Sequence, residues 1–152
     1  MKRFAFRFER VLETKRYFEE MKRTELAALI AQRLQDEQRM LAVQSALLER
    51  QRELAGRAEA RQVISDIARL ARYMSKLVDD IRRMQEQLAR WDERIEAKRE
   101  ELVEAKRETT ILEKLKASDR RAYDKALNDW EQKLIDEAAA GRYVRGVRGE
   151  VH

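Results

Sequence analysis

The chain has 152 residues, no proline, no cysteine and a formal net charge of +5 at pH 7. Charged residues make up 41% of it and aromatic residues only 7%, which is the composition of a coiled coil rather than of an ordinary globular core. No apolar run is long enough for a transmembrane segment, and no apolar stretch follows the basic N-terminus as it would in a secretory signal, so we expect a soluble, cytoplasmic protein.

The first half of the chain predicts one long helix. Near its start, one helical stripe carries the apolar residues Phe4, Phe8, Val11 and Phe18. No turn signal follows this stripe, so we expect a helix from about residue 5 to about residue 56. Between residues 21 and 55 the apolar positions form a broader and less regular stripe than those in the second half of the chain.

A turn is predicted within residues 56–64. Gly56 is the only glycine before position 141, and the apolar stripe lapses directly after it. Glycine ends helices readily because it adopts the left-handed conformation at low cost. About 50 residues lie on each side of this turn, so two arms of about 75 Å can pair in antiparallel fashion.

The second half carries a narrow apolar row. Alternating steps of four and three residues from position 63 meet Val63, Ile67, Leu70, Met74, Leu77, Ile81, Met84, Leu88, Trp91, Ile95, Lys98, Leu102, Ala105, Thr109 and Leu112. Only Lys98 and Thr109 interrupt the apolar character. A strict 3.5-residue repeat over about seven heptads is typical of a coiled-coil seam, which needs an equally long partner.

We expect this second helix, about 63–140, to extend past the end of the first. After a polar stretch at residues 116–119, the stripe resumes with a shifted phase at Tyr123, Leu127, Trp130 and Leu134. An exposed helix with these residues on one face is a candidate surface for docking a partner. Ala-Ala-Ala-Gly at 138–141 predicts the helix end, followed by a flexible tail over 141–152.

The predicted fold is therefore all-α: residues 1–152 form one antiparallel two-helix coiled-coil hairpin whose C-terminal helix overhangs. Positive charge is concentrated in three pieces of this hairpin. Residues 1–23 carry eight basic and four acidic residues, 98–121 carry eight and six, and 141–152 carry three and one, giving +4, +2 and +2. The antiparallel pairing predicts that all three pieces gather at the end where the two termini meet.

The sequence lacks the residues of an enzyme site. It has no cysteine and a single histidine at position 152, and it contains neither GxxxxGK[ST] nor GxGxxG. A two-helix hairpin also offers no concave pocket for a small substrate. We expect no enzyme activity, no metal site and no cofactor. Basic residues alternate with acidic ones, which disfavours nucleic acid as a partner.

Two stretches resemble the flagellar export protein FliJ family. Residues 4–12, Phe-Ala-Phe-Arg-Phe-Glu-Arg-Val-Leu, are similar to the family's opening Phe-x-Phe-Arg-Leu-Glu-x-Val-Leu, with Phe8 in place of the usual leucine. The family's C-terminal signature is similar to Leu-Val-Glu-Ala-Lys-Arg at 102–107, Leu-Glu-Lys-Leu-Lys at 112–116, Tyr123 and Glu-Gln-Lys-Leu-Ile-Asp-Glu at 131–137. With the length and the two-arm plan, the resemblance covers nearly the whole chain.

The resemblance implies a non-enzymatic stalk similar to the antiparallel coiled coil of the rotary ATP synthase gamma subunit. Proteins of this family associate with the hexameric flagellar export ATPase, couple it to the membrane export gate protein FlhA and are credited with escorting export chaperones. It therefore implies a cytoplasmic protein that is peripheral at the cytoplasmic face of the inner membrane.

The resemblance also suggests which surfaces meet which partner. The basic end would enter the ring lumen of the ATPase, and the candidate contacts there are Arg3, Arg7, Arg10, Lys114, Lys116, Arg120 and Arg121. The export gate would meet the half of the hairpin near the turn, where Met40, Val43 and Tyr73 are expected to lie off or beside the seam.

Two alternatives stay open on the sequence. The chain could be the stalk of an injectisome-type secretion system, which is a close analogue of the flagellar one. It could also be a generic coiled-coil scaffold or chaperone without an ATPase partner, and this hypothesis predicts a stable self-dimer through residues 117–140.

Overall fold

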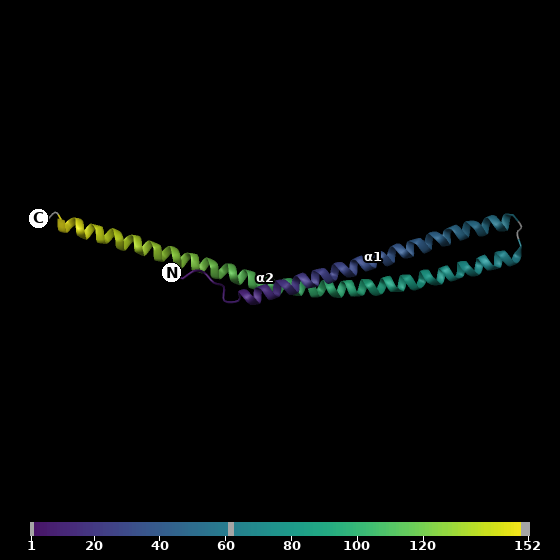
Figure 1. The fold of residues 1–152 in the computed structure, drawn as a ribbon, viewed down its shortest axis with the longest axis horizontal. Coiled ribbons are helices and arrows are strands. Elements are labelled where there is room, and N and C mark those ends of the chain that lie inside the picture. Colours follow the sequence, from purple (N-terminus) through teal and green to yellow (C-terminus); the bar gives the residue numbers. More distant parts are fainter. Residues whose placement is uncertain (1, 61–62, 150–152) are drawn as a thin grey trace. The chain divides into compact units, whose positions relative to one another are not determined.

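The computed structural model describes residues 2–60 and 63–149, which form two long helices (Figure 1). Helix α1 spans Glu9–Glu59 and helix α2 spans Ile64–Gly149. The described residues contain no strand. The two helices pack against each other, so the predicted all-α two-helix hairpin is confirmed. No helix among the described residues is apolar over a long enough stretch to cross a bilayer.

Two compact units share these helices. One combines Met1–Phe18 with Ala105–His152, and the other is Glu19–Glu104. Each unit contains a stretch of α1 beside a stretch of α2, and in both units the cross-helix contacts show an antiparallel pairing. Lys116 pairs with Glu9 and Lys15 with Glu108 in the first unit. Lys98 pairs with Glu25 in the second.

In the Glu19–Glu104 unit, the predicted row of α2 faces α1. Leu70, Leu77, Leu88 and Ile95 are buried. The residues between them in the row are half-buried, namely Ile67, Met74, Ile81, Met84, Trp91, Lys98 and Leu102. The 3.5-residue repeat thus locates the contact face of α2 correctly, because supercoiling keeps one narrow stripe on the partner along its length.

Half of the residues in the α1 row that faces α2 are charged. Steps of three and four residues from position 19 meet the half-buried apolar residues Leu26, Leu29, Met40, Val43, Leu47 and Leu54. Between them, at the same spacing, lie the half-buried charged residues Glu19, Lys22, Arg33, Asp36, Arg50 and Arg57. The stripe of α1 looked irregular in the sequence because polar side chains occupy these inward positions.

Polar contacts between the two helices pair several of the charged side chains in the seam. The Trp91 indole Nε1 donates a hydrogen bond to Asp36 Oδ2 at 2.7 Å. Lys98, which interrupts the apolar row, donates to Glu25 Oε2 at 2.8 Å and to Glu101 Oε2 at 2.9 Å. No buried side-chain nitrogen or oxygen among the described residues lacks a hydrogen-bond partner. Each polar side chain that replaces an apolar one in the seam is therefore compensated.

The N-terminal segment of the other unit differs from the predicted helix. Residues 2–6 are not helical, a turn follows at residues 7–8, and α1 begins at Glu9 rather than at about residue 5. Phe6 is buried, whereas Phe8 is partly exposed, so the predicted aromatic stripe is not the buried one. The helical stripe that would join Phe4 to Phe8 does not form here, because residues 2–6 lack the helical period of 3.6 residues. The next inward residue is Leu12, whose side chain is completely buried.

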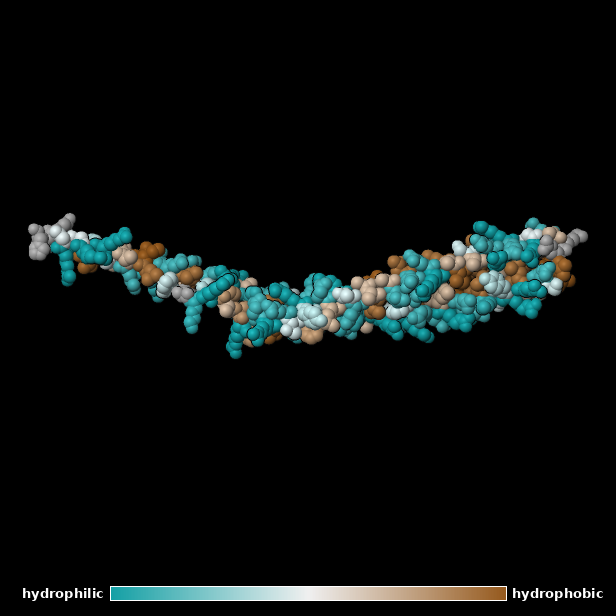
Figure 2. Space-filling view, viewed as in Figure 1, coloured by the Kyte–Doolittle hydropathy of each residue, from teal (hydrophilic) through white to brown (hydrophobic). Residues whose placement is uncertain are grey.

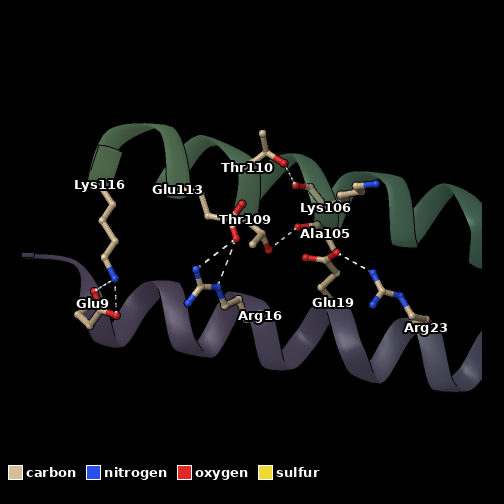
Figure 3. Close-up of polar contacts among 10 residues, drawn as sticks. All are labelled: Glu9, Arg16, Glu19, Arg23, Ala105, Lys106, Thr109, Thr110, Glu113 and Lys116. Atoms are coloured by element: carbon tan, nitrogen blue, oxygen red, sulfur yellow. Dashed lines mark hydrogen bonds and ion pairs between the residues drawn. The ribbon is translucent and has the colours of Figure 1, made fainter. Parts of the chain in front are cut away.

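The α2 part of this unit continues the row. Thr109 is 3% exposed, and its hydroxyl donates to the Ala105 carbonyl oxygen at 3.1 Å (Figure 3). The interruption of the apolar row by this threonine therefore leaves no unsatisfied polar group. Its neighbour Thr110 makes the same contact with the Lys106 carbonyl at 2.8 Å.

Helix α2 also ends later than the sequence predicts. It runs through Gly141 to Gly149, whereas we expected a flexible tail from residue 141. A single glycine within a helix costs only about 1 kcal/mol relative to alanine, and Arg145 Nε donates to the Gly141 carbonyl at 3.1 Å. At the other end, α1 passes Gly56 and ends at Glu59; residues 61–62 of the predicted turn lie outside the described residues.

Replacing Leu12 by alanine tests the core of the unit formed by Met1–Phe18 and Ala105–His152. We expect Leu12→Ala to lower the free energy of unfolding by about 2–4 kcal/mol, because a fully buried leucine loses both its transfer energy and its packing. Urea denaturation followed by far-UV circular dichroism measures this change. The matched control is Val11→Ala, at an exposed neighbouring position, with an expected loss below about 1 kcal/mol. Equal losses in the two variants would contradict the assignment of the buried row.

The Lys98 cluster predicts an acid-dependent loss of stability. Its hydrogen bonds with Glu25 and Glu101 raise the pKa of Lys98 and lower the pKa values of both carboxyl groups. A carboxyl whose pKa is lowered by folding stabilises the fold above its unfolded pKa of about 4.3, and this contribution is lost as the pH falls through the folded pKa. Lys98 stays protonated at acidic pH. Because its pKa is raised, its contribution to stability is lost only at alkaline pH.

We therefore expect the melting temperature to fall more steeply below about pH 5 in the wild type than in Lys98→Met, which keeps the side-chain volume and suits an apolar seam. Thermal unfolding between pH 3 and pH 7 measures the slope. Arg99→Met, at an exposed position on the same helical turn, serves as the control and should keep the wild-type slope. An unchanged slope in Lys98→Met would show that the cluster does not couple stability to pH.

Candidate partner-binding surfaces

The predicted ATPase-contact residues all lie in the unit formed by Met1–Phe18 and Ala105–His152, but they differ in availability. Lys116 is committed to the fold, because its ammonium pairs with Glu9 at 2.8 Å (Figure 3). Arg120 lies 5.2 Å from the centre of the Phe4 ring and also pairs with Asp124. The guanidinium of Arg7 lies over the neighbouring Phe8 ring.

The remaining four candidates are exposed, and among residues 2–60 and 63–149 they take part in no ion pair: Arg3, Arg10, Lys114 and Arg121. Their charges are therefore available to a partner. The three basic pieces of the sequence fall largely into this one unit, which contains residues 1–18, 105–121 and 141–149. An acidic partner surface would meet several cations of this unit at once, which favours fast, oriented association more than high affinity.

An aromatic contact holds the N-terminal segment against α2. The Phe4 and Tyr123 rings lie 5.5 Å apart, and the Tyr123 hydroxyl donates to the Lys2 carbonyl at 2.8 Å. Beside them, a shallow groove is lined by Phe4, Arg16, Glu113, Lys116, Ala117 and Arg120. The three cations of this groove are ion-paired within the unit: Arg16 with Glu113, Lys116 with Glu9 and Arg120 with Asp124. The groove therefore presents an aromatic ring among charges that are already compensated.

The predicted docking face of α2 is partly used in this contact. Tyr123 is half-buried because it holds the N-terminal segment, and Leu127 is also half-buried. Trp130 and Leu134 are 43% and 45% exposed. Figure 2 shows apolar side chains at the surface of this part of α2, between polar ones. The structure therefore leaves Trp130 and Leu134 as the exposed members of the predicted stripe.

In the Glu19–Glu104 unit, the three residues predicted to dock the export gate differ in their exposure to solvent. Met40 and Val43 are half-buried and occupy inward positions of the α1 row. Tyr73 is 46% exposed and lines a groove with Arg50, Arg57, Asp66, Arg69 and Leu70. Two of these arginines, Arg50 and Arg57, form ion pairs with Glu53. The hydrogen bond from Arg50 lowers the pKa of the Glu53 carboxyl.

Sequence reasoning missed an exposed apolar stripe on α1 of this unit. Leu34, Leu41 and Leu48 are 52%, 56% and 48% exposed, and Ile30 lies beside them. The signal was present in the sequence: these leucines recur every seven residues, and each follows an inward position directly. In the sequence they merge with the inward row into one broad stripe, and only the helix pairing separates the two.

A family model described as flagellar FliJ protein matches residues 4–148. The chain belongs to the FliJ family. The match covers both the phenylalanine-rich opening and the C-terminal signature, so the resemblance read from these two stretches is confirmed. No curated protein and no solved structure matches the chain.

FliJ family membership makes the chain a component of flagellar protein export and places it in a non-enzymatic family. It favours the flagellar system over the injectisome alternative. The described residues contain no group of histidine, cysteine, aspartate and glutamate side chains that could hold a metal ion.

Removing the Phe4 ring should release the N-terminal segment. We expect Phe4→Ala to speed tryptic cleavage after Arg7 several-fold, because the segment loses its contacts with Tyr123 and Arg120. Tyr123→Phe keeps the ring and loses only one hydrogen bond, so its effect should be smaller. Limited proteolysis followed by mass spectrometry gives the rates. Tyr17→Ala, which changes an exposed aromatic of α1, is the control; a similar acceleration in this variant would refute the anchoring role of Phe4.

Proposed function

We propose that this FliJ-family chain is a non-enzymatic stalk of the flagellar type III export apparatus. It binds the hexameric export ATPase through the unit formed by Met1–Phe18 and Ala105–His152, and it links the ATPase to the export gate protein FlhA through the Glu19–Glu104 unit. It acts in the cytoplasm, at the cytoplasmic face of the inner membrane. Escort of export chaperones is a second part of this proposal.

The observation that carries the proposal is the composition of the first unit. It combines Met1–Phe18 with Ala105–His152. Within the part of the chain that the structure describes, its cations Arg3, Arg10, Lys114 and Arg121 take part in no ion pair, and Trp130 of the same unit is exposed. These cations can orient the chain on an acidic ring surface, and the apolar side chains can add affinity once water is excluded.

The stripe of Leu34, Leu41 and Leu48 supports a second binding surface. A row of exposed leucines with heptad spacing suits an apolar helix or strand of a partner, and the neighbouring groove is lined by Ile30, Leu34 and Arg99 among others. Tyr73 lies in the same unit and offers both a ring and a hydroxyl. We assign the FlhA contact to these residues rather than to Met40 and Val43, whose surface is used in helix pairing.

Reversing two of the available cations tests the ATPase contact. We expect Lys114→Glu combined with Arg121→Glu to weaken binding to the export ATPase about tenfold and to reduce the stimulation of ATP hydrolysis, with a smaller effect at high salt. A pull-down and a steady-state ATPase assay measure both. The control is Lys76→Glu with Arg82→Glu, which reverses two exposed charges in the other unit. Wild-type protein that neither binds nor stimulates the ATPase would refute the proposal.

Polar substitution of the leucine stripe tests the gate contact. Leu41→Asp with Leu48→Asp should abolish binding to the cytoplasmic part of FlhA while leaving ATPase stimulation unchanged, because both positions are exposed and the helix pairing is untouched. Bio-layer interferometry with each partner separates the two functions. Gln38→Asp with Ser45→Asp, at exposed polar positions of the same helix, controls for the added charge. Loss of both interactions together would contradict separate surfaces.

A further inference from the structure

In the Glu19–Glu104 unit, α1 carries a second row of residues on the side that faces away from α2. Alternating steps of four and three residues meet this outer row, namely Ala27, Ala31, Leu34, Gln38, Leu41, Ser45 and Leu48. All seven residues are exposed. The outer row therefore has the 3.5-residue spacing of a coiled-coil seam, but no helix covers it among residues 2–60 and 63–149.

The outer row contains no charged residue, although charged residues make up 41% of the chain. At the same spacing, Glu20 and Arg52 are the first charged residues on either side of it. The corresponding exposed row of α2, from Arg72 to Glu96, differs sharply, because six of its eight residues are charged: Arg72, Asp79, Arg82, Glu86, Glu93 and Glu96. The lack of charge is therefore a specific property of the outer side of α1.

Large and small side chains alternate along the outer row. Leu34, Leu41 and Leu48 each follow a smaller or polar residue by three positions, namely Ala31, Gln38 and Ser45. In heptad notation the leucines then occupy d positions and the other three residues occupy a positions. Leucine at d is typical of parallel two-stranded coiled coils, and a polar residue at an a position specifies their register.

We propose that residues 27–48 of α1 form the interface of a parallel homodimer of this chain. In a parallel pair related by a two-fold axis, each residue of the row lies opposite the same residue of the second copy. Leu34, Leu41 and Leu48 each pack against their own copies. The two Gln38 side chains meet between leucine layers, where the amide of one can donate to the amide oxygen of the other.

The absence of charge selects a second copy over a different helix. A charged residue in a row that pairs with itself would meet an identical charge, which is unfavourable, whereas a row that binds a different helix can carry charges complementary to that helix. The residues beside the row also meet no like charge in this register. Glu37 lies beside Ala42 of the second copy, and Glu49 lies beside its Gln44.

The same row disfavours an antiparallel second copy. In an antiparallel pair, residues at a positions lie opposite residues at d positions. Gln38 would then face a leucine, and its amide would be buried without a hydrogen-bond partner. Parallel pairing avoids this cost because the two amides satisfy each other.

The inference does not depend on the proposed function, since it concerns the free chain. It adds a consequence for that function. A dimer covers Leu34, Leu41 and Leu48, so the proposed contact of these leucines with FlhA requires the dimer to dissociate.

The mass of the full chain, measured by analytical ultracentrifugation and light scattering, tests the interface. We expect a dimer at about 100 µM that dissociates on dilution, with a dissociation constant in the micromolar range. Leu41→Asp should be monomeric at this concentration, because two carboxylates would meet in the interface. Val78→Asp, which adds the same charge at an exposed apolar position of α2, should stay dimeric. A monomeric wild type, or a dimeric Leu41→Asp variant, would overturn the proposal.

Charge exchange at Ser45 tests whether residues of the row meet their own copies. Ser45→Glu alone and Ser45→Lys alone should each be monomeric, because like charges meet. An equimolar mixture of the two variants should restore a dimer of mixed composition, since opposite charges then lie face to face. A mixture that stays monomeric would refute the proposed register.

Cross-linking tests the direction of pairing. Because the chain has no cysteine, Ala31→Cys introduces a single thiol. This variant alone should form a disulfide-linked dimer under mild oxidation, since a parallel pair brings the two copies of residue 31 together. An antiparallel pair centred on the row would separate them by about 20 Å, at 1.5 Å per residue. Ser75→Cys, at an exposed position of α2, should not cross-link; a dimer in which Ala31→Cys also fails to cross-link would rule out parallel pairing.

Discussion

The apolar row of α2 is the constraint on which the rest of the fold depends. From Ile67 to Leu112, every position of this row is buried or half-buried. A helix with one apolar stripe of this length is stable in water only if a second helix covers it. The chain supplies that helix itself as α1, which ends at Glu59 before α2 begins at Ile64.

The pairing is asymmetric, and this asymmetry has a physical consequence. Half of the inward positions of α1 are charged, so the seam contains ion pairs and hydrogen bonds such as those of Asp36 with Trp91 and of Lys98 with Glu25. Polar groups in a seam contribute less stability than leucine but penalise shifted registers, in which they would lose their partners. We infer that the charged positions of α1 define the register of the pairing and that the apolar row of α2 provides most of its stability.

The same principle explains where partners can bind. Where α1 and α2 cover each other, only flanking residues such as Leu34, Leu41 and Leu48 remain exposed. Beyond Tyr123, α2 exposes Trp130 and Leu134, and the proposed ATPase contact includes this part of the helix.

The sequence by itself determined the helical class, the contact face of α2 and the family, because a strict 3.5-residue repeat and the phenylalanine-rich opening are local patterns. Only the tertiary structure decided which residues of α1 face inward, since Met40 and Leu41 are equally apolar and differ only in the direction they point. The same holds for Phe6 and Phe8, whose burial depends on a non-helical segment that contacts α2 through Phe4 and Lys2. Lys114 stays exposed whereas Lys116 pairs with Glu9. This difference depends on contacts between residues far apart in the chain, which no local sequence pattern indicates.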